Sequence, residues 1–153
     1  MGVLMKILAI NGSPNKEGST SKLIDAVISV CMKAGAECEK IYLGDYIIKC
    51  CSGCYKCIKG SECYQDDDFL HLKAKMIDAD GIIIGSPFYN GKPAKHLKRL
   101  MDRLAVSSTY YQLFDDKYIV GLSTSAANDC KAVAKYCAKL GNTEFLGGGI
   151  ASG

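Results

Sequence analysis

The chain has 153 residues, nine cysteines, no tryptophan and a formal net charge of +3 at neutral pH. A chain of this length buries roughly 70% of its unfolded surface in one core, so it does not need disulfides as staples. The small charge, with lysines scattered along the chain, does not favour a nucleic-acid partner. We predict a single domain over residues 1–153.

The amino-terminal stretch MGVLMKILAING has Lys6 inside its apolar run and no small-residue cleavage site. It therefore predicts a buried strand, Met5 to Ile10, rather than a signal peptide. No apolar run is long enough to span a membrane, so we expect a cytoplasmic protein. Thiols are kept reduced in that compartment, and a cysteine cluster there indicates metal binding or catalysis rather than cross-linking.

Short apolar runs alternate with helical patterns along the rest of the chain, which is typical of an α/β domain. We expect further strands over 37–43, 81–87, 117–123 and 144–151. We expect four helices. The first comes after the first loop, with apolar positions from Leu23 to Cys31 and a C-cap at Gly35, and the second begins at the aspartates of residues 66–68. The third and fourth are expected over 93–106 and 129–140. A doubly wound sheet is usually closed by one more helix; either that helix lies outside this sequence or a partner subunit covers the face.

The loop GSPNKEGSTS, residues 12–21, joins the first strand to the first helix, where backbone N–H groups form an anion site. It is not a Walker A loop, because Gly12 and Gly18 are one residue too far apart and Ser19 replaces the lysine, and it lacks the Rossmann glycine pattern. Its hydroxyl side chains are Ser13, Ser19, Thr20 and Ser21. A helix cap needs only one hydroxyl, so the pattern favours a bound phosphate.

A second loop, SPFYNGKP, follows the third strand. Ligands of open α/β sheets lie outside the carboxyl ends of the strands, where the strand order reverses. With the order 2-1-3-4-5, this loop faces the hydroxyl loop, so a flat ring can lie against Phe88 and Tyr89, with the amides around Asn90 and Gly91 at its polar edge. The loop STSAAND after the fourth strand adds small polar groups at the same end.

The segment CCSGCYKCIKGSEC, residues 50–63, holds five of the nine cysteines. The spacing C-x2-C-x2-C-x5-C is close to that of ferredoxins, and it selects Cys51, Cys54, Cys57 and Cys63 as ligands of one 4Fe-4S cluster. Gly53 and Gly60 permit the backbone angles of a tight wrap. Cys50 is left out because its side chain points away from that of Cys51 in an extended segment. A zinc site, a redox C-x-x-C pair and a metal-free loop are the alternatives.

The remaining reactive side chains are assigned no chemical role. Cys130 and Cys137 lie seven residues apart on one face of a predicted helix, and we expect both to be buried. His71 and His96 lie on amphipathic helices without paired acids.

The whole chain resembles the flavodoxin-like NAD(P)H-dependent FMN reductases and, within them, the iron–sulfur flavoproteins. The resemblance lies in GSPNKEGSTSKL, CSGCYKCIKGSECYQDDD and GIIIGSPFYNGKPAKHLKRLMDR. It implies a flavodoxin-like α/β fold, with a five-stranded parallel sheet of order 2-1-3-4-5, helices on both faces, and a cysteine-rich insertion at about residues 49–66 after the second strand. The implied FMN-binding residues are Ser13, Asn15, Ser19, Thr20 and Ser21 for the phosphate, Pro87, Phe88, Tyr89, Asn90 and Gly91 for the isoalloxazine, and Thr124, Ser125 and Ala126 from the third loop. Asn15 stands where many relatives carry a basic residue.

The function implied by this resemblance is an FMN-dependent oxidoreductase in which FMN exchanges electrons with a 4Fe-4S cluster. NAD(P)H or ferredoxin is the implied electron donor, and the implied assembly is a homodimer or homotetramer in which the cluster of one subunit approaches the FMN of another. A clusterless NAD(P)H-dependent FMN or quinone reductase is the first alternative and predicts flavin without iron. A flavodoxin-like electron carrier is the second, although the positive net charge argues against its acidic docking surface. A binding module with structural zinc would hold no flavin.

Overall fold

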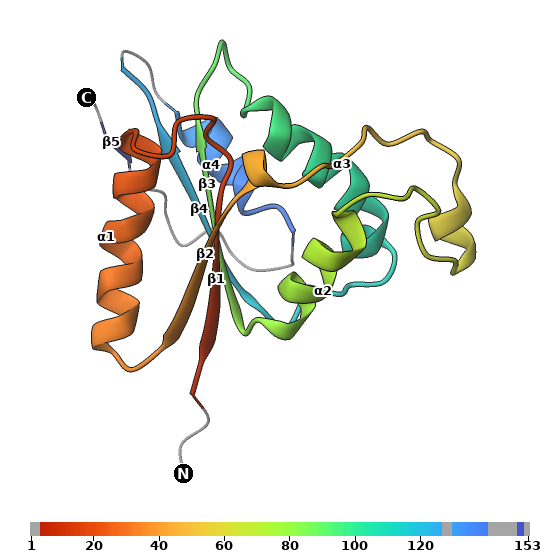
Figure 1. Cartoon of the computed structure of the whole chain (residues 1–153), viewed down its shortest axis with the longest axis horizontal. Coiled ribbons are helices and arrows are strands. Elements are labelled where there is room, and N and C mark those ends of the chain that lie inside the picture. Colours follow the sequence, from red (N-terminus) through yellow and green to blue (C-terminus); the bar gives the residue numbers. More distant parts are fainter. Residues whose placement is uncertain (1–3, 127–129, 141–149, 152–153) are drawn as a thin grey trace.

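A parallel β-sheet, seen nearly edge-on in Figure 1, runs through the centre of the molecule. The structure is a computed structural model, and it describes residues 4–126, 130–140 and 150–151. The strands are β1 (Lys6–Asn11), β2 (Glu37–Tyr42), β3 (Gly81–Pro87), β4 (Tyr118–Thr124) and β5 (Ile150–Ala151). Their order is β2-β1-β3-β4-β5, which is the predicted order. Four strands have six or seven residues, and β5 has only two.

Helices cover both faces of this sheet. They are α1 (Ser19–Lys33), α2 (Phe69–Asp78), α3 (Lys95–Thr109) and α4 (Lys131–Cys137), with short 3-10 helices η1 (Leu43–Asp45) and η2 (Lys56–Lys59). Helix α1 packs on one face, and α2, α3 and α4 pack on the other (Figure 1). This division follows from right-handed crossovers in a sheet whose strand order reverses after β2.

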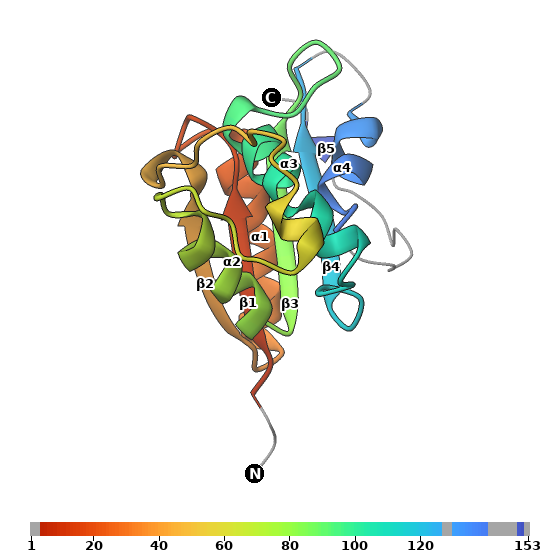
Figure 2. The same ribbon diagram turned by 90° about the vertical axis from the view of Figure 1, so that its right-hand side faces the viewer.

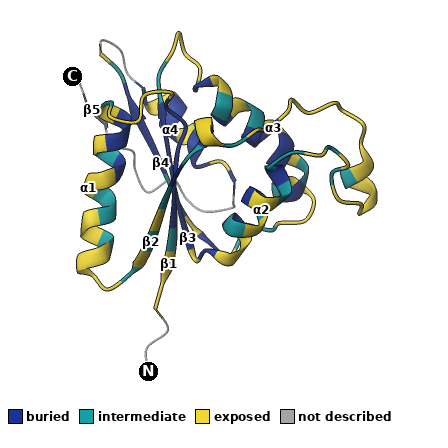
Figure 3. Ribbon diagram, viewed as in Figure 1, coloured by how far each residue is buried: buried dark blue, intermediate teal, exposed yellow. Residues whose placement is uncertain are grey.

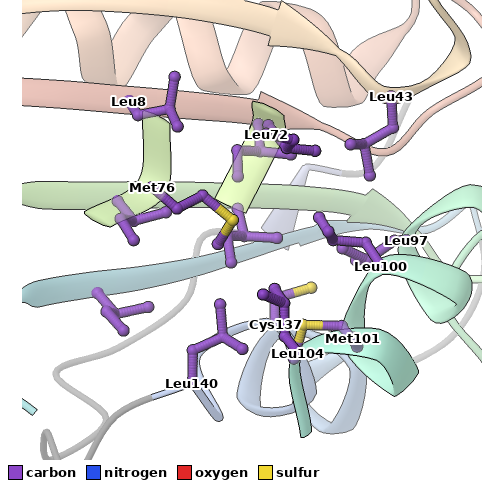
Figure 4. Packing of buried hydrophobic residues seen from close by; sticks show 14 of the residues in the cluster. Leu8, Leu43, Leu72, Met76, Leu97, Leu100, Met101, Leu104, Cys137 and Leu140 are labelled. Carbon is purple, nitrogen blue, oxygen red and sulfur yellow. The ribbon is translucent and has the colours of Figure 1, made fainter. Parts of the chain in front are cut away.

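Alternating side chains of the strands belong to two apolar layers, one on each face of the sheet. Leu8, Ile10, Ile82 and Ile84 face α2 and α3, where they join a large cluster (Figure 4). Ala9, Ile83 and Leu122 point to the opposite face and pack against Ile24 of α1. Figure 3 shows the central strands in the colour of buried residues, as expected for a parallel sheet covered on both sides.

The end of α1 matches the sequence prediction. Gly35 has a φ of 91°, and its N–H donates to Met32 O at 3.0 Å while Ala36 N–H donates to Cys31 O at 3.0 Å. These two hydrogen bonds form a Schellman motif, which favours glycine at the position after the C-cap. The glycine therefore ends the helix, as predicted.

The start of α2 differs in detail from the prediction. Asp68 is the N-cap residue, but its side chain makes no capping hydrogen bond; it accepts the N–H of Ile47 at 2.6 Å. Asp67 accepts the N–H of Phe69 at 3.1 Å and that of Lys49 at 2.8 Å. The acidic residues therefore also fasten the returning chain to residues 47–49.

Other bounds shift by a few residues. The third predicted helix begins at Lys95 rather than at residue 93, because residues 89–92 form a turn, and it continues to Thr109. Of the predicted strand 144–151, only Ile150–Ala151 is described; residues 144–149 and Asp129 lie outside the described residues. Cys130 and Cys137 are fully buried, as predicted. In the described part of the chain, every helix is too short or too polar to cross a bilayer.

Candidate flavin cleft and cysteine segment

Three loops meet at the carboxyl ends of β1, β3 and β4 and enclose a cleft of about 440 Å³. Its lining consists of Ser13, Asn15, Gly18, Ser19, Thr20, Pro87, Phe88, Tyr89, Thr124, Ser125 and Ala126. All except Gly18 were predicted from the sequence. The cleft lies where the strand order reverses, between β1 and β3, which is where ligands of open α/β sheets bind. A hollow of about 150 Å³ at the opposite end of β1 is bordered by the ion pairs Lys6–Asp78 and Lys75–Glu39.

The first loop is shaped by its own short polar side chains. Asn11 Oδ1 accepts the N–H of Ser13 at 2.9 Å, Ser13 Oγ accepts that of Asn15 at 3.1 Å, and Asn15 Oδ1 accepts that of Glu17 at 3.0 Å. Such turns fold the backbone locally and lead it into α1. Gly18 is the N-cap and α1 has no side-chain cap, so a phosphate there would meet free amide donors.

Direct hydrogen bonds join the three loops. Thr20 Oγ1 and Thr124 Oγ1 lie 2.7 Å apart in the buried floor of the cleft. The N–H of Phe88 donates to Thr124 O at 2.9 Å, and Ser86 Oγ accepts the N–H of Ala94 at 2.9 Å. The lining from all three loops therefore forms one connected unit.

The tip of the second loop lies beyond the cleft. Asn90 and Gly91 have φ angles of 48° and 80°, and Tyr89 and Lys92 exchange hydrogen bonds of 2.9 and 3.0 Å across them. Positive φ at both central residues is the type I′ turn, for which Asn-Gly is the preferred pair. Asn90 and Gly91 are exposed and outside the lining, whereas Pro87, Phe88 and Tyr89 line it.

Ser21 also lies outside the cleft lining. Its hydroxyl is buried and faces β2, where it accepts a hydrogen bond from Lys40 Nζ at 2.7 Å and lies 3.4 Å from the Tyr42 hydroxyl. The pKa of Tyr42 is lowered by its hydrogen bonds with Ser21 and Lys40. Thus four of the five predicted phosphate-loop residues line the cleft, and Ser21 fixes α1 to the neighbouring strand instead.

The cysteine segment, residues 50–63, lies on the outer side of α3, away from the sheet (Figures 1 and 2). Cys51 and Cys54 are exposed, Cys57 and Cys63 are half-buried, and all nine cysteines of the chain are free. Gly53 and Gly60 have φ angles of 64° and 84°, which glycine adopts without strain.

The four predicted ligands are not gathered in this structure. No three cysteine, histidine or acidic side chains of the described residues stand close enough to hold one metal ion. The donor chemistry nevertheless suits an iron–sulfur cluster, which thiolates hold. Hydrogen bonding by the backbone of Lys56 lowers the pKa of the exposed Cys54 thiol, which favours the form that binds metal.

Helix α3 and the turn after it hold the segment through two residues that the sequence analysis missed. Arg103 Nη2 donates to Cys63 Sγ at 3.2 Å, and Arg103 Nη1 lies 2.7 Å from Asp67 Oδ2 and donates to Lys49 O at 3.1 Å. Tyr111 donates its hydroxyl hydrogen to Cys57 O at 2.8 Å. A buried arginine requires an acid, and the aspartates beside the last cysteine were the signal that would have pointed to the pair.

The Asp67–Arg103 pair is fully desolvated, since the two side chains are 0% and 1% exposed. Burial opposes ionisation of Asp67, but hydrogen bonds from Arg103, Lys49 and Phe69 outweigh it and lower the pKa of the carboxyl group. Likewise, burial opposes the charge of Arg103, and Asp67 raises the pKa of the guanidinium above its usual value. Both groups are therefore charged at neutral pH.

The strand order and the position of the cleft define a flavodoxin-like α/β protein. Residues 5–142 match the family of NADPH-dependent FMN reductases. The chain belongs to this family, as the resemblance in its loops predicted.

Several curated relatives of the chain are named iron–sulfur flavoproteins. The chain is 48% identical over 99 residues to an iron–sulfur flavoprotein of Archaeoglobus fulgidus. This match covers 65% of this chain and 48% of that protein. An iron–sulfur flavoprotein of Methanocaldococcus jannaschii is 41% identical over 99 residues, with 65% and 51% covered. The chain thus spans about half the length of these relatives.

Solved structures support the same fold. The crystal structure of RosB, with a bound 8-demethyl-8-formylriboflavin 5′-phosphate, superposes with a TM-score of 0.76. The match covers 97% of this chain and 65% of that chain at 17% identity. At this identity the likeness concerns the fold.

Proposed function

We propose that this protein is an FMN-dependent oxidoreductase that couples FMN to a 4Fe-4S cluster. The cleft carries the proposal: it joins a polar loop at a helix N-terminus to an aromatic loop at the switch point of a flavodoxin-like sheet. Membership of the NADPH-dependent FMN reductase family supports the same ligand.

In this proposal the phosphate of FMN lies in the first loop. Ser13, Ser19 and Thr20 supply hydroxyl donors, and the first turn of α1 supplies amides. Asn15 lines the loop without a positive charge, so neutral donors hold the phosphate. Ser21 contributes at most its backbone N–H, because Lys40 occupies its hydroxyl.

The isoalloxazine ring lies against the second and third loops. Pro87, Phe88 and Tyr89 give the cleft its apolar wall, and Thr124, Ser125 and Ala126 close the opposite side. Asn90 and Gly91 lie at the exposed turn, where they are placed to cover the ring edge only if the turn folds inward.

Cys51, Cys54, Cys57 and Cys63 are the proposed cluster ligands. Their spacing supports this assignment, as do the names of the relatives, iron–sulfur flavoproteins. Arg103 and Tyr111 fix the neighbourhoods of Cys63 and Cys57, whereas Cys51 and Cys54 are exposed, so the exposed pair closes onto the fixed pair when the cluster is bound. FMN supplies one- or two-electron chemistry when bound, and the cluster supplies one-electron chemistry.

The proposed cleft lies beside the start of α3, and the cysteine segment lies beside its middle and its end. The helix begins at Lys95 beside the second loop, and Arg103 is eight residues further on, about 12 Å along the axis. The helix ends at Thr109, roughly 21 Å from its start, and Tyr111 follows two residues later. This separation favours a homodimer or homotetramer in which the cysteine segment of one subunit lies against the cleft of another.

The proposed electron donor is NAD(P)H or ferredoxin, and the proposed compartment is the cytoplasm, where free cysteines stay reduced. The second candidate function is a clusterless NAD(P)H-dependent FMN or quinone reductase, which membership of the NADPH-dependent FMN reductase family supports without requiring iron.

An absorption spectrum of protein purified without oxygen, with flavin, iron, sulfide and zinc assayed on the same sample, tests these functions. Flavin with about four irons per chain supports the coupled enzyme. Flavin without iron, even after anaerobic reconstitution, supports the clusterless reductase, and failure to bind FMN contradicts both. Cys51→Ser and Cys50→Ser form a matched pair, because only the first removes a proposed ligand.

A further inference from the structure

Arg103 is held rigidly between the cysteine segment and the core. Its guanidinium carbon lies 4.2 Å from the centroid of the Phe69 ring, and Asp67 and Lys49 O accept from its Nη1. Its Nη2 donates to Cys63 Sγ at 3.2 Å. Its Nε–H is buried and has no partner among the described residues.

A fixed positive charge with a hydrogen bond to a ligand sulfur acts on an iron–sulfur cluster in a known direction. Reduction adds negative charge to the cluster, and both the cation and the hydrogen bond stabilise that charge. They therefore raise the reduction potential. The effect is strong where the donor is shielded from water, and the whole Arg103 residue, backbone included, is only 5% exposed.

We propose that Arg103 is a positioning residue that holds Cys63 as a ligand and raises the reduction potential of the cluster by hydrogen bonding to its sulfur. The inference rests on the proposed function, because it assigns a role to Arg103 only if the cysteines bind the cluster. It goes beyond that function by identifying the residue that joins α3 to the ligand set.

The rival explanation is that Arg103 only completes a buried ion pair. Arg103→Gln and Asp67→Asn separate the two roles, since each breaks the same pair but only the first removes the donor to Cys63. A purely structural role predicts a loss of stability in both variants and the same potential for whatever cluster remains. A tuning role predicts that Arg103→Gln lowers the potential and that Asp67→Asn does not, because only the first variant removes a positive charge and a hydrogen bond beside the cluster.

The experiment is a redox titration of the anaerobically reconstituted full chain, followed by electron paramagnetic resonance, with iron and sulfide assayed per chain. We expect Arg103→Gln to lower the midpoint potential and to lose iron, and Asp67→Asn to retain iron with an equal or higher potential. An unchanged potential in Arg103→Gln overturns the proposal, as does a fall of the same size in Asp67→Asn.

A double variant, Arg103→Met with Asp67→Leu, keeps the test decisive if Arg103→Gln fails to fold. Apolar residues of similar volume often replace a buried ion pair without loss of stability. We expect this variant to fold and to show a lowered cluster potential, and a potential equal to that of the wild type would overturn the tuning role. A wild-type chain that takes up no iron contradicts the proposed cluster itself, whereas an iron-loaded wild type with unaffected variants overturns only the role of Arg103.

Discussion

Thr20 and Thr124 place their hydroxyl oxygens 2.7 Å apart, which ties the first turn of α1 to the end of β4 across the floor of the cleft. Strand β3 lies between β1 and β4, so this contact joins loops that no strand pairing connects. Thr124 O also accepts the N–H of Phe88, which fixes the aromatic loop to the same point. The position of Phe88 in the cleft wall therefore depends on the Thr20–Thr124 contact in the cleft floor.

Replacing Thr20 by valine removes this hydrogen bond and one proposed phosphate donor while keeping the shape of the side chain. We expect FMN to bind about fivefold more weakly, since one hydrogen bond contributes about 1 kcal/mol. Titration of FMN fluorescence measures the change. Ser29→Ala is the control, because its hydroxyl donates to Asp25 O on the exposed side of α1. Equal FMN affinity in Thr20→Val and wild type would contradict this role.

The parts of the site that sequence reasoning predicts are those that topology fixes. Hydroxyl and aromatic loops at the ends of β1 and β3 have to face each other once the strand order is known, and they do. Ser21 lies outside the cleft lining because neighbouring helical positions differ by about 100°, so Thr20 faces the cleft while Ser21 faces Lys40. Asn90 and Gly91 lie outside it because their preferred turn carries them to the loop tip.

The cysteine segment shows what sequence spacing does not predict. Spacing identifies which thiols are able to share a cluster, but their positions without one depend on tertiary contacts. Those contacts come from Arg103, 40 residues after Cys63, and from Tyr111, 54 residues after Cys57. Cysteine spacing does not reveal such distant partners; for Arg103 the only signal is the group of aspartates beside Cys63, which indicates a buried cation nearby.

Tyr111→Phe tests how the segment is anchored. The change removes the hydroxyl that donates to Cys57 O at 2.8 Å and lies 3.2 Å from Ile58 O. We expect faster hydrogen exchange and faster proteolysis over residues 50–63, with little change in the core, because exposed loops open locally without global unfolding. Tyr110→Phe is the matched control, since this neighbouring ring is exposed. Equal exchange of the segment in both variants would rule out this anchor.

Gly121 sets how closely α4 approaches the sheet. A Cβ atom there would lie 1.9 Å from Ala134 O and 2.9 Å from Ala138 N, both backbone atoms of the α4 region that cannot rotate away. We therefore expect Gly121→Ala to destabilise the fold by about 3 kcal/mol, at the upper end of overpacking costs. Urea unfolding measures this, and Gly44→Ala is the control because nothing lies within 4 Å of the added atom. Similar urea midpoints for Gly121→Ala and Gly44→Ala would show that α4 shifts to make room for the added methyl group.

The buried pair of Asp67 and Arg103 makes stability depend on pH in acid. The pKa of Asp67 is lowered in the folded protein, so its contribution is complete above the unfolded value of about 3.9 and is lost as the pH falls through the folded value. Asp67→Asn leaves Arg103 buried without its counter-charge, and we expect it to cost about 3 kcal/mol at pH 7.

This difference from wild type should shrink as the pH falls below about 4, because protonation then removes the same charge from the wild-type protein. Urea midpoints of the metal-free protein between pH 7 and pH 3 measure the convergence. Asp78→Asn is the control: its partner Lys6 is exposed, so we expect its midpoint to stay near that of wild type throughout. A gap between Asp67→Asn and wild type that stays constant down to pH 3 would show that Asp67 acts through packing, since only a charge is lost on protonation.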